Sequence, residues 1–341
     1  MYKTIIPLIL LLITIVNSAF TYPRLSVEHK APCKNCHISP SGGGMRTEFA
    51  NYAVALNELT LPSTKNIAVK NYKAPRLSES VTFGFDTRHL IFDDATIFRM
   101  QTDFFANIEL FENMNYNLRF SENGISENYG IFYTDKKKHY VRFGRFAPSF
   151  GLKQSDHKSY NRERLGHGSL TYLDGLGVGI EIGGHLLNAE LVNYGQQTIF
   201  MGHLMKSGNL KSIGIFGGAS LQLPEEEANH SRFPQAKAIF GGLSYNRFTF
   251  MGEVDLVGKS NDTLSAYVNL TSRLEYGLYL IGEYNFFDGN RNLANGVDEF
   301  YRFSVEFYPI SFFQIRPSYT YYTEGYKKDQ SDFFVQVHFG Y

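Results

Sequence analysis

The sequence predicts an all-β protein: a transmembrane antiparallel β-barrel of about 16 strands, preceded by a small helical segment. Three observations predict this fold. From Ser78 to the end of the chain, apolar and polar residues alternate in one short segment after another. The connections between these segments are short and long in turn. Beyond the N-terminus no apolar run is long enough for a transmembrane helix, so only a closed barrel could cross a membrane.

Residues 1–20 have the layout of a secretory signal peptide. A lysine precedes the apolar run 5–16, and the small residues Ser18 and Ala19 follow it. A membrane anchor is the alternative, but the run is shorter than the roughly 18 residues that an anchor needs. We therefore expect an exported protein that is cleaved close to these small residues.

A C-x-x-C-H motif, formed by Cys33, Cys36 and His37, contains the only two cysteines of the sequence. Two thiols at this spacing can each add to a vinyl group of one porphyrin, and the next residue then places an imidazole at the iron. The alternative is a disulfide, which exported proteins also form. However, the strand-helix alternation of a thioredoxin-like fold does not surround the motif. We therefore predict one covalent haem c bound by Cys33, Cys36 and His37, with His37 as an axial ligand of the iron.

The motif lies in a segment, residues 21–75, that is predicted to form a small cytochrome c-like unit. Pro40 and the run Gly42–Gly44 indicate a loop. An amphipathic helix is expected over 45–58, where the apolar residues Phe49, Tyr52, Ala53 and Leu56 fall at helical spacing. A segment of this size is near the lower limit at which a chain buries a core alone, so a neighbouring part should cover the haem.

Two residues near the motif are candidates for the second axial ligand of the iron. Met45, at the start of the expected helix, offers a thioether. His29, four residues before Cys33, offers an imidazole. Met45 could instead be a packing residue and His29 an exposed polar residue, and an open sixth position is a further alternative. The sequence leaves this choice open.

Residues 76–341 are predicted to form the barrel. The expected strands are 78–91, 95–109, 113–121, 127–134, 137–146, 171–182, 185–193, 198–206, 210–221, 236–244, 247–257, 263–272, 275–286, 299–308, 311–322 and 331–341. The expected tight connections are Glu112-Asn113, Asp135-Lys136, Gly183-Gly184, Ser207-Gly208-Asn209, Asn246-Arg247 and Pro309-Ile310, and the long ones are 146–170, 222–235 and 287–298. All the long connections fall at the opposite end from the tight ones. Short periplasmic turns and long outer loops are typical of outer-membrane barrels, whereas a soluble sandwich has no reason for this parity.

If the apolar faces of the strands point outward, polar residues and charges of both signs line the lumen. This set comprises Asp86, Arg88, Arg99, Asp103, Arg119, Glu253, Asp255, Glu283, Arg302, Glu306, Arg316, Gln336 and His338. The long loop at 146–170 resembles the constriction loop of general porins, which folds back into the pore. Asp156 and His157 in this loop either line the channel or cap turns of the loop.

The order of these parts resembles the fused monohaem cytochrome-porins of bacterial outer membranes, including the iron-oxidising outer-membrane cytochromes. The resemblance covers the mature chain by architecture, and its sharp motif is Cys33, Cys36 and His37. It implies a bacterial outer-membrane location in contact with lipid, with the cytochrome segment periplasmic or inside the barrel. Basic and acidic residues are equal at 33 each, which indicates no nucleic-acid partner.

The resemblance also implies an electron conduit. The haem would pass electrons from an extracellular donor, for example ferrous iron, to a periplasmic cytochrome or other carrier, which would make the protein an iron(II) oxidase. An outward apolar band of about 25 Å is too tall for a haem wholly on the periplasmic side to be reached from outside. One alternative is a diffusion porin whose haem segment acts as plug or redox sensor, and another is a haem enzyme such as a peroxidase. The physiological donor, the redox potential and the oligomeric state do not follow from the sequence.

Overall fold

The computed structural model describes residues 23–134, 138–154, 159–168, 171–225, 232–293 and 296–340, so the predicted signal peptide lies outside the described residues. The helices are α2 (Pro23–His29), α3 (Cys33–Cys36), the π-helix η1 (Ala50–Ala55), α4 (Leu56–Glu58), α5 (Pro62–Asn71) and α6 (Tyr160–Glu163). The strands are β1 (Arg76–Ser78), β2 (Val81–Phe92), β3 (Ile97–Phe111), β4 (Met114–Ser121), β5 (Gly124–Thr134), β6 (His139–Phe146), β7 (Leu173–Ile182), β8 (His185–Tyr194), β9 (Gln197–Leu210), β10 (Ile213–Pro224), β11 (Ala236–Tyr245), β12 (Phe248–Val257), β13 (Thr263–Glu275), β14 (Leu278–Asp288), β15 (Val297–Ile310), β16 (Phe313–Glu324) and β17 (Ser331–Gly340).

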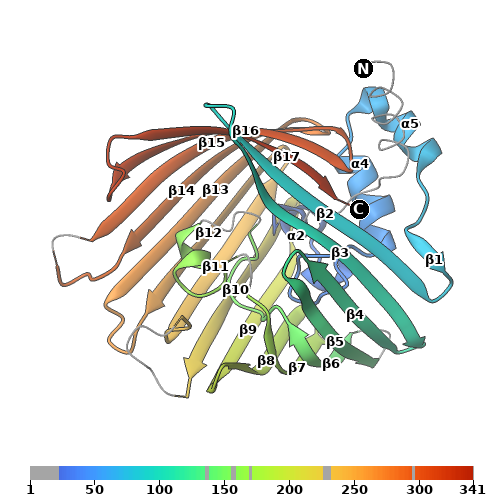
Figure 1. The fold of residues 1–341 in the computed structure, drawn as a ribbon, viewed down its shortest axis with the longest axis horizontal. Coiled ribbons are helices and arrows are strands. Elements are labelled where there is room, and N and C mark those ends of the chain that lie inside the picture. Colours follow the sequence, from blue (N-terminus) through green and yellow to red (C-terminus); the bar gives the residue numbers. More distant parts are fainter. Residues whose placement is uncertain are drawn as a thin grey trace.

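Strands β2 to β17 form a closed antiparallel barrel in which each strand pairs with its neighbours in the sequence (Figure 1). The barrel closes where β17 pairs with β2, with Phe334 opposite Phe92 and Gly340 opposite Asp86. The short β1 pairs with the start of β2 and stands outside the closed ring. Closure leaves the ring without an unpaired edge, as a membrane-spanning sheet requires. The predicted fold and the count of 16 barrel strands are confirmed.

The outer face of the barrel is apolar and the inner face is polar, as strand β8 shows. Leu187 and Leu191 point outward and are 46% and 53% exposed, whereas Asn188 and Glu190 between them are each 1% exposed. Exposure of such a large apolar outer surface to water would be unfavourable, whereas lipid chains can cover it. The protein is accordingly an outer-membrane barrel, as the sequence predicts. None of the helices in the described residues is long and apolar enough to span a membrane.

The connections differ between the two ends of the barrel. Tight turns at 112–113, 183–184 and 246–247 agree with the prediction, while two others lie slightly further along the chain, at 211–212 and 311–312. The predicted turn at Asp135-Lys136 lies outside the described residues. Gly183 and Gly184 both have positive φ, +58° and +78°, which matches the two-residue turn that suits the twist of a hairpin. The long connections all lie at the other end, which confirms the predicted parity.

Most of the charged residues predicted for the lumen are buried there in ion pairs. Asp86 accepts hydrogen bonds from Arg88 and from His338, at 3.2 and 2.9 Å. Arg99 is an exception, because its side chain is 58% exposed and pairs with Glu122 at the rim. The prediction for Arg99 is wrong because the register of β2 against β3 shifts at this point, and a bulge changes the face to which the following side chains point.

In the N-terminal segment, α2 lies inside the barrel, whereas α4 and α5 lie at the mouth that carries the tight turns (Figure 1). Helix α2 contacts the inner faces of β9 to β12. Arg24 on this helix forms an ion pair with Glu306 of β15 at 2.8 Å, and both side chains are almost fully buried. At the mouth, the N–H of Gly277, in the turn before β14, donates to the carbonyl of Glu58 at 3.0 Å. The segment therefore packs as a plug, as its small size predicts.

Replacement of Gly214 of β10 by a larger residue is expected to displace helix α2 from the barrel wall. A Cβ atom at this position would lie 2.4 Å from the carbonyl oxygen of Val27, which is closer than a carbon atom and an oxygen atom that are not bonded can approach. We expect Gly214→Leu to displace the plug and to accelerate cleavage of residues 23–75 in limited proteolysis of the folded barrel. Gly208→Leu is the control, because a Cβ there meets open space. Equal resistance of both variants to proteolysis would contradict the packing.

The helix predicted to begin at Met45 begins later. The N–H of Ala50 donates to Thr47 Oγ1 at 3.2 Å, so Thr47 caps the first turn. Met45 lies instead in a bend before the helix, where its carbonyl accepts a hydrogen bond from the N–H of Ile38 at 3.0 Å. The reason is the run Gly42–Gly44, whose φ angles of +80°, +79° and +61° turn the chain back alongside the motif.

The buried face of this helix also differs from the prediction. Phe49 and Tyr52 are 55% and 56% exposed, whereas Ala50, Val54 and Leu56 are buried. The prediction assumed α-helical periodicity throughout. The wider π-helical turns of η1 rotate the side chains relative to that periodicity, and so other residues face the barrel.

Candidate functional site

The C-x-x-C-H motif forms a single helical turn inside the barrel. Pro32 precedes α3 with a φ of −67°, which suits the start of a helix. The N–H of His37 donates to the carbonyl of Cys33 at 2.9 Å and closes the turn. Cys33 and Cys36 therefore lie on neighbouring positions of one turn. Both are free thiols in the structure, rather than the alternative disulfide.

The loop after the motif is held against the barrel wall. Arg142 of β6 donates from Nη1 to Ser41 Oγ at 3.0 Å, and Ser41 Oγ donates to the carbonyl of Ala147 at 2.7 Å. Gly42 follows with a φ of +80°, and a Cβ atom there would lie 3.5 Å from the Sγ of Cys33. The loop therefore closes over one side of the motif in a conformation that favours glycine.

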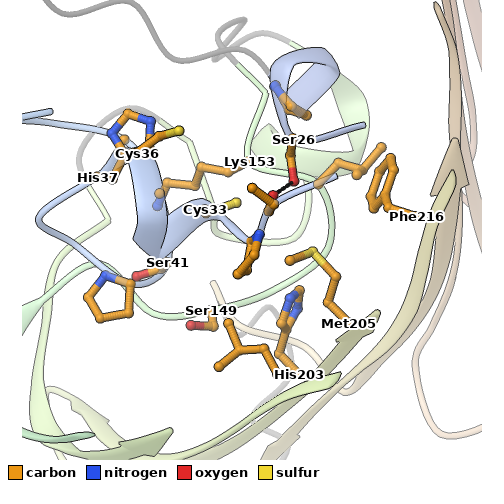
Figure 2. A pocket seen from close by; sticks show the side chains of 18 of the residues that line it. Ser26, Cys33, Cys36, His37, Ser41, Ser149, Lys153, His203, Met205 and Phe216 are labelled. Atoms are coloured by element: carbon orange, nitrogen blue, oxygen red, sulfur yellow. Dashed lines mark hydrogen bonds between the residues drawn. The ribbon is translucent and has the colours of Figure 1, made fainter. Parts of the chain in front are cut away.

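A cavity of about 60 Å³, here called the lumen cavity, lies between the motif and the barrel wall (Figure 2). Its lining comes from three parts of the chain. The N-terminal segment contributes Cys33, Cys36, His37 and Arg46; the wall contributes Leu186, Asn188, His203, Met205, Phe216 and Phe240; the loop after β6 contributes Ser149, Phe150 and Lys153. The wall side of the cavity is mostly apolar, as the linings of cofactor pockets generally are.

Burial governs the ionisation of the motif. It raises the pKa of the Cys33 thiol to about 11, with a smaller contribution from Cys36, and it also raises the pKa of Cys36. Burial, together with the nearby guanidinium of Arg46, lowers the pKa of His37 to about 3. At neutral pH the thiols are therefore protonated and the imidazole is neutral, which is the form that binds metals.

These residues fit a covalently bound haem. The two thiols are free, and both face the cavity that a porphyrin would have to occupy. The Nδ1 atom of His37 is buried and has no hydrogen-bond partner at normal distance among the described residues, although the backbone of Gly43, Gly44 and Met45 lies close to the ring. An orphaned buried nitrogen in a native structure calls for an explanation, and a missing ligand is one. The apolar wall opposite would cover the porphyrin, as the small size of the segment requires.

The predicted candidates for the second axial ligand lie elsewhere. Met45 is buried and precedes Arg46, the residue that pairs with His37 in an isolated β-bridge. His29 ends α2. Neither Met45 nor His29 is among the residues that line the lumen cavity. Ligation by Met45 or His29 stays a prediction. Asp156 and His157 lie outside the described residues, so their expected place in the channel stays a prediction as well.

Sequence reasoning missed His203 and Met205, which line the lumen cavity from β9. The signal for them was present, because Met201, His203 and Met205 alternate with outward-facing residues along this strand. That alternation predicts an inward direction. It does not indicate which inward residues meet the motif.

The loop after β6 folds back into the lumen, as its resemblance to a porin constriction loop predicts. Glu190 of β8 accepts hydrogen bonds from the N–H and the hydroxyl of Ser149, at 3.0 and 2.8 Å. The same carboxylate pairs with Arg142 at 2.5 Å, and both side chains are fully buried. A charged pair of this kind holds the loop against the wall at the edge of the lumen cavity.

His167, further along this loop, predicts a pH dependence of stability. Its ring stacks on Phe150 with centroids 4.8 Å apart, and its Nε2–H donates a hydrogen bond to Oε1 of Gln222 of β10 at 2.8 Å. Burial, aided by Lys153 and Arg162, lowers its pKa to about 3 from 6.5. The unfolded loop therefore binds more protons than the folded loop between these values, so stability rises with pH over this window.

We expect the loop to lose protection from proteolysis as the pH falls from 6.5 toward 3, and this loss to be weaker in His167→Gln. The measurement is cleavage of the loop in the folded barrel at a series of pH values. Identical pH profiles for wild type and variant would contradict the role of His167.

Comparison with known proteins supports the barrel. No protein-family model matches the chain, and no curated protein matches it. Among solved structures, OprB of Pseudomonas putida is similar, with a TM-score of 0.63 and 9% identity over 84% of this chain and 99% of that one. OmpT of Vibrio cholerae has a TM-score of 0.57 and 12% identity over 78% and 99%. OmpF of Salmonella typhi, in a complex with daunomycin, has a TM-score of 0.54 and 10% identity over 76% and 97%.

These likenesses at low identity concern the fold. They confirm a porin-like outer-membrane barrel, which is the barrel part of the resemblance seen in the sequence. These comparisons do not concern the C-x-x-C-H motif, and the argument for a haem at this motif uses only the residues of the lumen cavity.

Proposed function

We propose that the protein holds one covalent haem c in the lumen cavity and conducts electrons across the outer membrane. The extracellular donor would be a reductant such as ferrous iron, and the acceptor a periplasmic cytochrome or other carrier. The observation that carries the proposal is the position of the motif. Cys33, Cys36 and His37 face a mostly apolar cavity that lies inside the barrel, between the two ends of the lumen.

The residues of the cavity have separate roles in this proposal. Cys33 and Cys36 attach the group through thioether bonds, and His37 binds the iron. Phe216 and Phe240 on the wall exclude water from the opposite side. A haem c bound there supplies one-electron redox chemistry, at a potential set by its axial ligands and its burial.

Access from outside is supported by a second cavity at the end that carries the long loops. It has a volume of about 680 Å³ and is lined by residues such as Tyr160, Glu163, Arg164, Asp298 and Lys327. Acidic and basic side chains both line this cavity, so it offers a polar, water-accessible entrance whose charge does not by itself select a cation. From below, the short plug helices α4 and α5 lie at the periplasmic turns, where a soluble carrier could dock.

Rapid mixing of the oxidised, purified protein with ferrous iron tests the proposal. We expect the spectrum of a reduced haem to develop at a rate that increases with the iron concentration. A colourless protein from purified outer membranes would exclude the cofactor. A coloured protein that ferrous iron does not reduce would leave the cofactor in place and exclude iron as the donor.

A diffusion porin with a plug is the second candidate, and the likeness to OprB, OmpT and OmpF favours it. In that case residues 23–75 would restrict the pore rather than serve electron transfer. Swelling of liposomes that contain the wild-type protein separates the two candidates. Rapid entry of sugars, unchanged by reduction or oxidation of the protein, would support the porin, whereas slow entry is expected for the conduit.

A further inference from the structure

His203 of β9 stands apart from the other residues of the barrel wall. It lines the lumen cavity together with the motif, and Figure 2 shows its ring projecting from the wall into that cavity. The side chain is 9% exposed. Its Nδ1 atom shares a hydrogen bond with Ser220 Oγ of β10 at 2.9 Å, and its ring stacks on Phe240 with centroids 5.1 Å apart and planes 13° apart. Two neighbouring strands therefore hold the imidazole in one orientation.

The hydrogen bonds around His203 leave its other nitrogen available. Ser220 Oγ accepts the N–H of Gly151 at 2.9 Å and retains a second lone pair, with which it can accept a hydrogen bond from Nδ1–H of His203 in one of the two tautomers of the imidazole. In that tautomer Nε2 carries the free lone pair, and it makes no hydrogen bond to any described residue. Metal-bound histidines characteristically have their second nitrogen held by such a hydrogen bond, which sets the tautomer and the orientation of the ring.

Burial of this imidazole has an energetic cost, which the hydrogen bond to Ser220 offsets at Nδ1 only. The nearby Met205, which also offers a ligand atom, is different. It packs in an apolar cluster with Val27, Leu152 and Phe216, so packing accounts for its position. The contacts of His203 with Phe240 and Ser220 instead orient its ring so that it lines the same cavity as the motif.

We propose that His203 is the second axial ligand of the haem, so that the plug and the barrel wall each supply one imidazole. The inference rests on the proposed cofactor. His37 and the two thioether cysteines keep their roles. His203 takes the place of Met45 and His29, the candidates from the sequence, as the second ligand of the iron. Ligation from both sides would also join the plug to β9 through the iron.

The experiment compares full-length proteins matured with haem and purified from outer membranes. The oxidised wild type should be six-coordinate and low-spin, with the electron paramagnetic resonance signature of two imidazole ligands. His203→Gly should be high-spin, and added imidazole should restore the low-spin spectrum. His185→Gly is the control, because this histidine lies at the exposed start of β8 and does not line the cavity. Its spectrum should equal that of the wild type.

Haem staining of the same samples on denaturing gels separates the possible failures. An unstained wild-type band would overturn the proposed cofactor itself. A stained His203→Gly protein that remains low-spin would overturn only the role of His203, as would a high-spin wild type. A change to high spin in Met205→Leu or Met45→Leu, with His203→Gly unchanged, would assign the ligand to that methionine. If His203→Gly does not assemble, a wild-type signature that lacks two imidazole ligands would still overturn the role of His203.

Discussion

Replacing both Cys33 and Cys36 by alanine is expected to abolish covalent haem attachment completely while the barrel still folds. The two thiols line the lumen cavity and are the only cysteines of the chain, so no other side chain can form the thioether bonds. The barrel itself is held by the ladders of 16 strands, which the motif does not join. Haem staining on a denaturing gel measures attachment, and heat-dependent migration of unboiled samples measures barrel folding.

Asn35→Ala is the matched control for this double replacement. Asn35 lies between the two cysteines on the same turn, and its side chain is exposed, so its loss leaves the thiols and the imidazole in place. The control should retain haem at the wild-type level. Persistent staining of the double variant would show that the motif does not attach a haem, and the electron-conduit proposal would then fail.

Glu190→Ala is expected to destabilise the barrel by about 3–5 kcal/mol, because removal of one partner leaves a buried charge without its counterion. Arg142 and Glu190 are 0% and 1% exposed in their side chains and lie 2.5 Å apart. Glu190 also holds Ser149, so the variant should release the loop after β6 from the wall. Urea unfolding, followed by gel migration and by circular dichroism, measures the loss in the free energy of unfolding.

The exposed pair of Arg99 and Glu122 provides the control for this prediction. Its side chains are 58% and 47% exposed, and surface pairs contribute only about 0–1 kcal/mol. Glu122→Ala should therefore change the unfolding midpoint little. A loss of similar size in both variants would show that burial does not govern the contribution of these pairs.

The strands were predictable because each of them repeats one physical rule. Because lipid lies outside the barrel and polar groups lie inside, apolar and polar residues alternate along every strand. Segments such as β8 and β16 can therefore be recognised as strands from their own residues. The errors fall where a local rule is interrupted. Arg99 lies beside a register shift, and the π-helical turns of η1 move Phe49 and Tyr52 to the exposed face. Neither interruption has a signature in composition or spacing.

The sequence by itself determined the barrel, the strand order and the C-x-x-C-H motif, since alternation, turn chemistry and covalent attachment are local properties of the chain. Only the tertiary structure decided where the motif lies and what faces it. All inward positions of a barrel look alike in sequence. Which of them meets the motif depends on the seating of α2 against Gly214 and on the folding of the loop held by Glu190, and both are contacts between segments far apart in the chain. For this reason His203 is identified by the assembled lumen and not by the order of residues.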